Sequence, residues 1–345
     1  MANERLPALA DTGAMSAFLE INDLSVAFRP RNLAGWLQRR AGTGLRAVNG
    51  LSLSLERGDT LAIIGERGCG KNRLVRAMLR LTGIAAGDIH FDGQSLRTLR
   101  GPALAQFRRR VQMLSPDPIA SLNPRLSVAE TLAEPLQVHG LAANRDIAQR
   151  VDALMAQVGL PADLLRRRPA ALTAGECHRL AVARALAVEP ELLIVNDSLA
   201  GLDLSIQAQI INLLSELRHA RNLTLIYVAH DPRDARHLCR SAAIMYLGRI
   251  VEQGPIEEIL TRPRHPYSQA LLAATPKMRA DAPPPTAALA GDPPRALDLP
   301  PGCAFHPRCA KVKAACRTGL PPVRRRDGPV TVWCHLYPEG ASARP

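Results

Sequence analysis

The sequence predicts an α/β fold built on a parallel sheet, and two observations predict it. First, the apolar run Leu61–Ile64 has the pattern of a buried strand, glycines crowd residues 65–70, and an apolar helical pattern follows from Leu74. Second, helical and strand patterns alternate in the second half of the chain, as they do in parallel α/β layers. The helical patterns are 176–188 and 205–219, and the strand patterns are 192–196, 223–228 and 243–247.

The composition is typical of a protein with one large core. The chain has 345 residues, 47% of them hydrophobic, and a net charge of +13. It has no apolar run of bilayer length and no secretory pattern in residues 1–20, so we expect a cytosolic protein. The basic surplus suits an anionic membrane surface. An aromatic content of 3% offers few side chains to stack on bases and argues against nucleic acid as a partner.

The first elements can be placed in chain order. Residues 1–17 show no strong period, and we expect a flexible tail there. Apolar and polar residues alternate over Phe18–Phe28 and Leu45–Leu55, which predicts strands of an antiparallel edge. The helix after the glycines is expected to reach about Leu81, and a short strand is expected near Ile89.

The middle of the chain is expected to be mainly helical. A short strand near Val111 precedes a helical stretch over 122–171, in which Pro135 and Pro161 are predicted breaks. The alternating helices and strands follow. After them, eight prolines within residues 276–301 predict a stiff linker.

Cysteines are concentrated at the end of the chain. Four of the seven follow the linker, namely Cys303, Cys309, Cys316 and Cys334. A reducing cytosol disfavours disulfides, and four thiolates within 32 residues resemble a ligand set for zinc or an iron–sulfur cluster. Their gaps of five, six and seventeen residues differ from the close cysteine pairs of zinc ribbons.

The glycine-rich segment has the chemistry of a phosphate-binding loop. Gly65, Gly68 and Gly70 allow backbone N–H groups to curl around phosphate oxygens, while Lys71 and the helix N-terminus supply positive charge. The usual motif continues with Ser or Thr, whose hydroxyl binds Mg²⁺, but this chain has Asn72. The sequence therefore predicts a nucleotide site with an altered metal contact.

Several further segments are distinctive, within a stretch of family-like sequence that extends from about Phe18 to Tyr337. They are 117-DPIASLNPR-125, 202-LDLSIQAQI-210, 230-HD-231, 246-YLGRIVEQGP-255, 265-HPYSQALLAATP-276 and 303-CAFHPRC-309. In this order the motifs resemble those of the ATP-binding subunits of ATP-binding-cassette (ABC) importers. The resemblance is closest to the second ATPase subunit of importers of the dipeptide, oligopeptide and nickel type.

The resemblance implies a P-loop NTPase fold of the ABC type, with a RecA-like core, an antiparallel β edge and a helical subdomain at about 117–175. It implies a nucleotide-binding domain over 18–275, the linker over 276–301 and a Cys-rich C-terminal domain over 302–345. In that family the four tail cysteines are associated with a [4Fe–4S] cluster, with zinc as the alternative. The implied partners are a second ABC ATPase subunit, two transmembrane permease subunits and, indirectly, an extracytoplasmic solute-binding protein, at the cytoplasmic face of the inner membrane.

The resemblance also assigns the contacts to ATP. Phe28 falls at the position of the aromatic residue that stacks on adenine, although a core phenylalanine is an equal alternative. Asp203 falls in the loop that communicates between the two ATP sites of a dimer. The expected ATP-binding residues are Gly65, Glu66, Arg67, Gly68, Cys69, Gly70, Lys71, Asn72, Arg73 and Phe28.

The catalytic positions depart from the family pattern one after another. The metal-binding hydroxyl is replaced at Asn72 and the aspartate ending the Walker B strand at Asn196, so both protein ligands for Mg²⁺ are neutral. The catalytic glutamate is replaced by Asp197, which is shorter by one methylene. The Q-loop glutamine falls at Pro116, which has no side-chain amide. His230 remains at the position that contacts the γ-phosphate.

The signature loop, which completes the partner's ATP site, is closer to the family sequence LSGGQ. It reads 172-LTAGE-176 here and opens a helix. Thr173 keeps the hydroxyl and Gly175 the close backbone approach, whereas Ala174 and Glu176 depart from the pattern. We expect this loop to be weakened but serviceable in trans.

Charge differences suggest a compensation for the altered metal contact. Arg67 and Arg73 add two positive charges to the usual loop and Asn196 removes one negative charge, a shift of +3. The hypothesis is that the site holds ATP without a metal; the alternative is that one or both arginines point to solvent. If the chain is aligned with the family pattern one residue further on, Asp197 is the metal-binding aspartate and Ser198 stands at the position of the catalytic glutamate.

Three functional interpretations compete. The first is an energy-coupling subunit of a peptide-type importer whose own site is degenerate and whose partner hydrolyses ATP. The second is an ordinary, if slower, ATPase subunit of the same importer. The third is a non-transport or regulatory ABC protein. The first is favoured because four catalytic positions deviate together.

Overall fold

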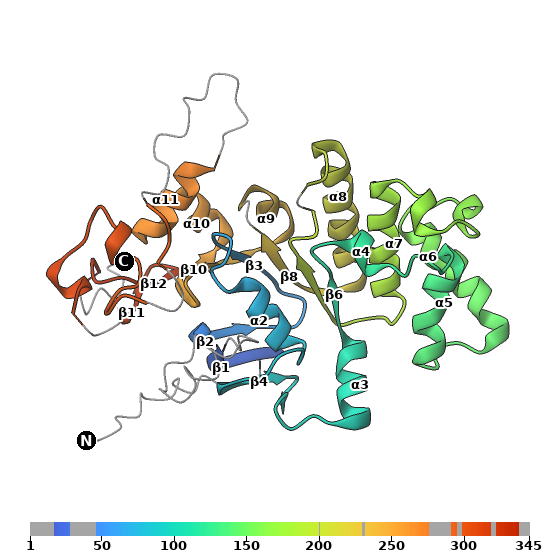
Figure 1. Cartoon of the computed structure of the whole chain (residues 1–345), viewed down its shortest axis with the longest axis horizontal. Helices are drawn as coiled ribbons and strands as arrows, with labels where there is room; N and C mark the ends of the chain where they lie inside the picture. Colours follow the sequence, from blue (N-terminus) through green and yellow to red (C-terminus); the bar gives the residue numbers. More distant parts are fainter. Residues whose placement is uncertain are drawn as a thin grey trace, which may run out of the picture.

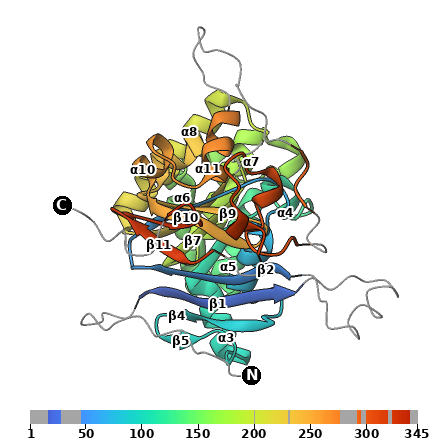
Figure 2. The ribbon, with the colours of Figure 1, turned by 90° about the vertical axis from the view of Figure 1, so that its left-hand side faces the viewer.

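Two sheets are stacked at the centre of the molecule (Figure 2). The structure is a computed structural model that describes residues 17–27, 46–199, 201–229, 232–275, 291–294, 299–318 and 322–337. Much of the predicted tail and linker lies outside these residues, and the division into domains stays a prediction. We call the described residues from 299 to 337 the C-terminal extension.

The smaller sheet is antiparallel, as the alternating patterns predict. It has four strands in the order β2-β1-β4-β5. Leu19, Ile21 and Val26 of the first strand are buried, so one face of this sheet packs on the core. The strands are β1 (Leu19–Ala27), β2 (Arg46–Leu55), β4 (Ala86–Phe91) and β5 (Gln94–Ser95).

The larger sheet has eight strands in the order β11-β12-β10-β9-β3-β8-β7-β6. The neighbours from β9 to β6 pair in parallel. Every residue of β3, β7 and β8 is buried, which explains why these strands are continuous apolar runs in the sequence. The strands are β3 (Thr60–Ile64), β6 (Val111–Leu114), β7 (Leu192–Asn196), β8 (Thr224–Ala229), β9 (Ser241–Tyr246), β10 (Arg249–Pro255), β11 (Arg324–Asp327) and β12 (Val330–Trp333).

Helices cover this sheet, and a helical group lies at the end opposite the C-terminal extension (Figure 1). That group contains α5, α6 and part of α7, in the region predicted to be helical. The helices are α2 (Lys71–Met78), α3 (Gly101–Arg110), α4 (Pro118–Ser121), α5 (Val128–Val138), α6 (Ile147–Gln157), α7 (Ala174–Leu186), α8 (Leu204–Arg221), α9 (Pro232–Leu238), α10 (Ile256–Thr261) and α11 (Pro266–Ala274).

One predicted helix break is confirmed and the other is wrong. Pro161 follows the end of α6, as expected, but Pro135 lies inside α5. The buried side chains of Val128, Leu132 and Leu136 are all 0% exposed. Their packing outweighs the single backbone hydrogen bond that Pro135 cannot donate.

The C-terminal extension continues the larger sheet. Strand β12 pairs with β10, placing Val332 opposite Glu252, and β11 pairs with β12. Sequence patterns did not predict this hairpin because three of the four residues of β11 are arginines. Val330 and Val332 are fully buried, so the extension packs on the core through β12.

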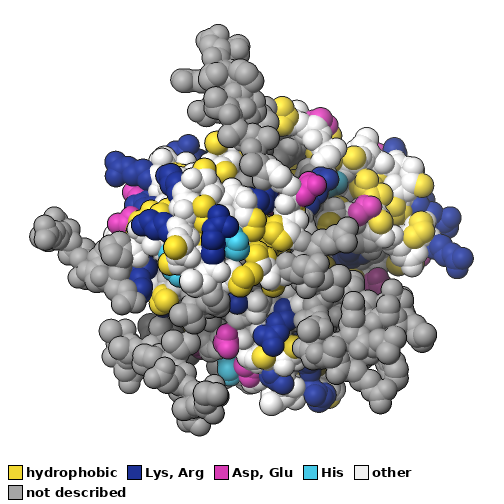
Figure 3. Space-filling model, turned by 60° about the vertical axis from the view of Figure 1, so that its left-hand side comes forward, with side chains coloured by type: hydrophobic (Ala, Val, Ile, Leu, Met, Phe, Trp, Pro, Cys, Tyr) yellow, Lys and Arg dark blue, Asp and Glu magenta, His cyan; other side chains and the backbone are white. Residues whose placement is uncertain are grey.

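Charged side chains are spread over the surface. Figure 3 shows Lys and Arg side chains at separate places on one face, between apolar and uncharged groups. This distribution fits solvated basic faces better than one concentrated patch. Among the described residues, no helix combines the length and apolarity needed to cross a bilayer.

Candidate functional site

The predicted phosphate loop connects the buried strand β3 to helix α2. Gly68 and Gly70 have φ angles of 82° and 113°, a region that favours glycine. A Cβ at Gly65 would lie 2.2 Å from the Met245 carbonyl oxygen, and one at Gly70 equally close to that of Ala47. The loop is therefore a backbone cradle that larger residues would fill, as phosphate binding requires.

Lys71 is the first residue of α2, and its side chain is only 5% exposed. Its Nζ donates to the carbonyl oxygens of Gly65 and, at 3.0 Å, Glu66. Burial lowers the pKa of the ammonium, and the neighbouring Cys69 and Asp197 partly offset that effect. The Lys71 ammonium is thus bound to carbonyl oxygens of the loop itself, and phosphate oxygens of a nucleotide can replace these partners.

The other expected loop residues differ in exposure. Asn72 and Arg67 are exposed, whereas Arg73 is half-buried. The exposure of Arg67 agrees with the alternative that this arginine points to solvent. The proposed charge compensation stays a prediction for both arginines.

Two catalytic candidates lie at the carboxyl end of β7. Asn196 is 3% exposed, and its Oδ1 makes no hydrogen bond to any described residue. Asp197 has a φ of 51°, and its backbone N–H donates to Val228 of the neighbouring strand at 2.8 Å. A buried amide oxygen without a donor is an available metal ligand, so the site offers oxygen donors that suit Mg²⁺, although only Asp197 is anionic.

Pro116, at the predicted Q-loop position, is exposed just beyond strand β6, the neighbour of β7. The structure therefore brings the positions predicted for the Q-loop glutamine and the Walker B aspartate to one edge of the sheet. Asp203 accepts a hydrogen bond from the Ile206 N–H at 2.9 Å and caps α8. Phe28 and His230 lie outside the described residues.

The predicted signature loop forms the N-terminus of α7. The Thr173 hydroxyl accepts from the Glu176 N–H, and the Glu176 carboxylate accepts from the Thr173 N–H at 2.7 Å. The Glu176 carboxylate is thus engaged in a capping box at the start of α7. Ala174 begins the helix, and Gly175 lies against Ile206 of α8, where a Cβ would come within 3.3 Å.

His178 is a site residue that sequence reasoning missed. Its Nε2 lies 2.8 Å from the carbonyl oxygen of Ser198, one residue after Asp197. The contact joins the signature helix to the segment that follows β7. The sequence shows a histidine within the predicted helix 176–188, but no local pattern indicates this contact, and its burial is seen only in the structure.

The four cysteines of the C-terminal extension lie near one another. Burial, together with a smaller contribution from the other three thiols, raises the pKa of Cys303 to about 11. Each sulfur accepts a backbone N–H, as ligand thiolates commonly do. The donors are Phe305 for Cys303, Lys311 for Cys309, Lys313 for Cys316 and Leu336 for Cys334. However, no group of three or more His, Cys, Asp or Glu side chains in the described ranges is arranged to hold a metal ion, so the metal prediction is not confirmed.

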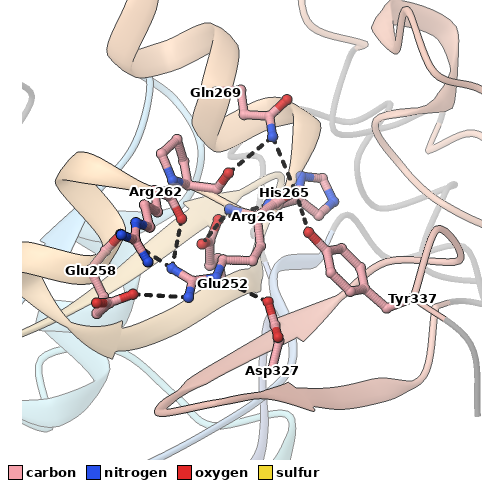
Figure 4. A network of polar contacts seen from close by, with 9 residues as sticks. Glu252, Glu258, Arg262, Arg264, His265, Gln269, Asp327 and Tyr337 are labelled. Atoms are coloured by element: carbon pink, nitrogen blue, oxygen red, sulfur yellow. Dashed lines mark hydrogen bonds and ion pairs between the residues drawn. The ribbon is translucent and has the colours of Figure 1, made fainter. Parts of the chain in front are cut away.

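A polar network anchors the segment before α11 to the sheet (Figure 4). The fully buried Glu252 accepts from the backbone N–H groups of Arg264 and His265, at 2.8 and 2.9 Å. Arg264 forms ion pairs with Glu258 at 2.9 Å and with Asp327 of β11 at 3.1 Å. The network therefore connects β10, α11 and the C-terminal extension.

Two residues from these segments reach the phosphate loop, and sequence reasoning missed both contacts. Arg308 forms an ion pair with the Glu66 carboxylate at 2.9 Å, and the Tyr267 hydroxyl accepts from the Glu66 N–H at 3.0 Å. Both residues lie in segments that the sequence marks as distinctive, but nothing in those segments indicates their target.

Comparisons with known proteins agree with this arrangement. The family model described as ABC transporter matches residues 48–200, and the model for the oligopeptide/dipeptide transporter C-terminal region matches residues 251–316. The oligopeptide transport ATP-binding protein AppF of Bacillus subtilis is 38% identical over 92% of this chain and 97% of its own length. The oligopeptide transport ATP-binding protein OppF of Salmonella typhimurium is 38% identical over 88% of this chain and 91% of its own length.

Solved structures show the same fold. One is cbiO1 of Clostridium perfringens, part of the ABC transporter complex cbiONQ, with a TM-score of 0.61, 25% identity and coverage of 71% of this chain and 91% of that protein. Another is the ATP-binding cassette MJ0796 bound to ADP and Pi, with a TM-score of 0.60, 20% identity and coverage of 69% and 98%. The chain therefore belongs to the family of ATP-binding subunits of oligopeptide/dipeptide ABC transporters.

Proposed function

We propose that this chain is the ATP-binding, energy-coupling subunit of a peptide import system and that it hydrolyses the ATP it binds. The observation that carries the proposal is the phosphate cradle, in which glycine backbone encloses Lys71 beside Asp197. The loop N–H groups would bind the phosphate oxygens, and Lys71 would exchange its carbonyl partners for them. Asp197 would orient the attacking water.

The degenerate interpretation remains the competing one. Asn72, Asn196 and Pro116 remove a hydroxyl, a carboxylate and an amide from the expected machinery. The matches to transport ATP-binding proteins over most of the chain support an ordinary subunit better than an inactive one. They also favour transport over the non-transport interpretation.

Magnesium and partners belong to the same proposal. Asn196 Oδ1 is the described oxygen that would hold Mg²⁺, which when bound neutralises charge on the phosphates. Each ATP site would be completed by the signature loop of a second ATPase subunit. We further propose that the pair docks on two permease subunits at the cytoplasmic face of the membrane and receives solute from an extracytoplasmic binding protein.

The cysteine cluster is proposed to hold a [4Fe–4S] group. Four thiols that influence one another electrostatically, each accepting a backbone N–H, support a soft metal group larger than a single ion. Anaerobically purified protein should absorb visible light if the group is iron–sulfur. A colourless protein that contains zinc would contradict the iron–sulfur assignment.

The function is tested by titrating a fluorescent ATP analogue onto the purified chain with and without Mg²⁺, and by measuring phosphate release. We expect Mg²⁺-dependent binding and slow release, with Lys71→Ala weakening binding by roughly 10- to 100-fold because charge-assisted hydrogen bonds are lost. Metal-independent binding without release would favour the degenerate interpretation. The absence of any binding would overturn the proposal.

A further inference from the structure

Arg308 binds Glu66 across a long sequence separation. Its guanidinium donates to both carboxylate oxygens of Glu66, at 2.9 and 3.1 Å, although 242 residues separate the two. The Arg308 side chain is 5% exposed and that of Glu66 is 22% exposed. A bidentate pair of this kind is directional as well as strong, so it restricts where residue 66 can lie.

The backbone of Glu66 is held from the same side. Its N–H donates to the Tyr267 hydroxyl at 3.0 Å, and Tyr267 is fully buried in α11. The Tyr267 ring packs on Tyr246 and on Phe305 of the C-terminal extension, with centroids 4.5 and 5.4 Å apart. The main chain of Glu66 is thus fixed by α11, and its side chain by the C-terminal extension.

Glu66 in turn determines part of the phosphate cradle. Its carbonyl oxygen accepts from Lys71 Nζ, the group expected to bind phosphate. Its carboxylate would be an unpaired negative charge next to a polyphosphate if Arg308 were absent. Arg308 therefore both fixes the loop and neutralises Glu66, and each effect would favour nucleotide binding.

The turn that carries Arg308 also carries two of the clustered cysteines. The 3₁₀ turn His306–Arg308 begins where the His306 N–H donates to the Cys303 carbonyl at 2.9 Å. It ends where the Cys309 N–H donates to the His306 carbonyl at 3.3 Å. Any change that moves Cys303 or Cys309 must therefore displace Arg308 as well.

We propose that Arg308 is a positioning residue for the phosphate loop. A change in the arrangement of the four clustered cysteines alters nucleotide affinity through Arg308. The inference rests on the proposed ATP-binding function of the loop. The cluster acts on the loop through a rigid turn and one ion pair, with no direct contact to nucleotide. Arg308 is accordingly a connection between two sites and does not itself touch the reacting atoms.

The first experiment compares the affinity of the full-length chain for a fluorescent ATP analogue in three variants. We expect Arg308→Met to weaken binding on the order of tenfold, within the usual range of coupling between sites. Arg308→Lys should be intermediate because it keeps the charge but not the bidentate geometry. Adding Glu66→Gln to Arg308→Met should recover part of the loss because the unpaired carboxylate is removed. Arg317→Met, at an exposed arginine one residue after Cys316, is the matched control.

A second experiment tests whether the clustered cysteines affect nucleotide affinity through Arg308. Cys309→Ala should weaken nucleotide binding in the wild-type background but have little further effect in Arg308→Met, since both changes act through one connection. Cys239→Ala, at a buried cysteine outside the extension, is the control and should not change affinity. Additive losses from Cys309→Ala and Arg308→Met would overturn the proposed path.

A third measurement separates this inference from the ATP-binding function. Hydrogen–deuterium exchange of residues 65–73 in nucleotide-free protein should become faster in Arg308→Met and remain unchanged in Arg317→Met. This readout applies even if the wild-type chain binds no nucleotide, which would reject the function but not the positioning role. Unchanged exchange in these residues together with ATP affinity within about twofold of wild type would reject the role of Arg308.

Discussion

The phosphate loop differs from the carboxyl ends of strands β6 and β7, which we call the β6–β7 edge. The loop keeps the glycines and the lysine that the family resemblance predicts, whereas the β6–β7 edge does not keep its predicted residues. In the loop, the glycine cradle and Lys71 are intact, and Tyr267 and Arg308 hold the loop in addition. At the β6–β7 edge, Pro116 and Asn196 lie at the positions where the family resemblance predicts glutamine and aspartate. Under the proposed function, ATP binding in the loop would rely on backbone N–H groups, whereas hydrolysis at the edge would rely on individual side chains. Substitutions at the edge can therefore slow turnover without removing the ATP site.

Removal of the Asp197 carboxylate at the β6–β7 edge should slow ATP hydrolysis strongly. Asp197→Asn should lower the rate of phosphate release by about 10²- to 10⁴-fold, as for loss of a general base, while ATP affinity changes little. Phosphate release at saturating ATP measures it, with Asp152→Asn, at an exposed aspartate of α6, as the comparison variant. Equal rates for Asp197→Asn and wild type would mean that the edge no longer catalyses, and the degenerate interpretation would replace ours.

The cradle itself should be sensitive to a single methyl group. Gly65→Ala would place a Cβ 2.2 Å from the Met245 carbonyl oxygen and 2.9 Å from Cys69 Sγ. We expect the free energy of unfolding to fall by about 1–3 kcal/mol from overpacking, together with a loss of ATP binding. Urea denaturation measures the first effect. Gly83→Ala, with no heavy atom within 4 Å of its Cβ, should be nearly neutral; similar losses in both variants would contradict the cradle argument.

Introducing a carboxylate at residue 196 should make ATP binding depend more strongly on Mg²⁺. Asn196→Asp returns an anionic oxygen to the buried end of β7, and we expect Mg²⁺ to strengthen ATP binding by about tenfold more than in wild type, ~1.4 kcal/mol. ATP titrations over a range of Mg²⁺ concentrations measure the change. Asn123→Asp, at an exposed asparagine, is the control. If the Mg²⁺ dependence does not change, residue 196 is not a metal ligand.

The smallest expected effect is in the signature loop. Thr173→Ala removes the hydroxyl that caps α7 and should lower the free energy of unfolding by about 1 kcal/mol. Thr173→Ser keeps the hydroxyl and should retain most of that stability. Thermal unfolding of the two variants side by side is the measurement. Equal melting temperatures would show that the capping box does not stabilise the helix.

Local patterns were enough to predict the loop and its flanking elements. The buried strand before Gly65, the helix beginning near Lys71 and the capped helix after Thr173 each follow from neighbouring residues. Propensity, glycine spacing and capping act over a few residues, so the sequence displays them directly. The prediction at Pro135 failed because burial of the opposite helix face outweighed a local rule.

Contacts between distant segments could not be predicted in this way. The target of Arg308 is Glu66, and the partner of β12 is β10, far earlier in the chain. Side-chain pairs of this kind depend on how the sheet is assembled, which a local pattern does not encode. A run of three arginines in β11 looks like a solvated segment until its pairing with β12 is known.

The separation between Glu66 and Arg308 also has a consequence for biosynthesis. The phosphate loop leaves the ribosome early, whereas the arginine that holds it emerges 242 residues later. Long-range contacts of this kind form slowly and only when both partners are present. A nascent or prematurely terminated chain that lacks Arg308 would carry an unsupported loop. Completion of the polypeptide would therefore be a condition for tight nucleotide capture.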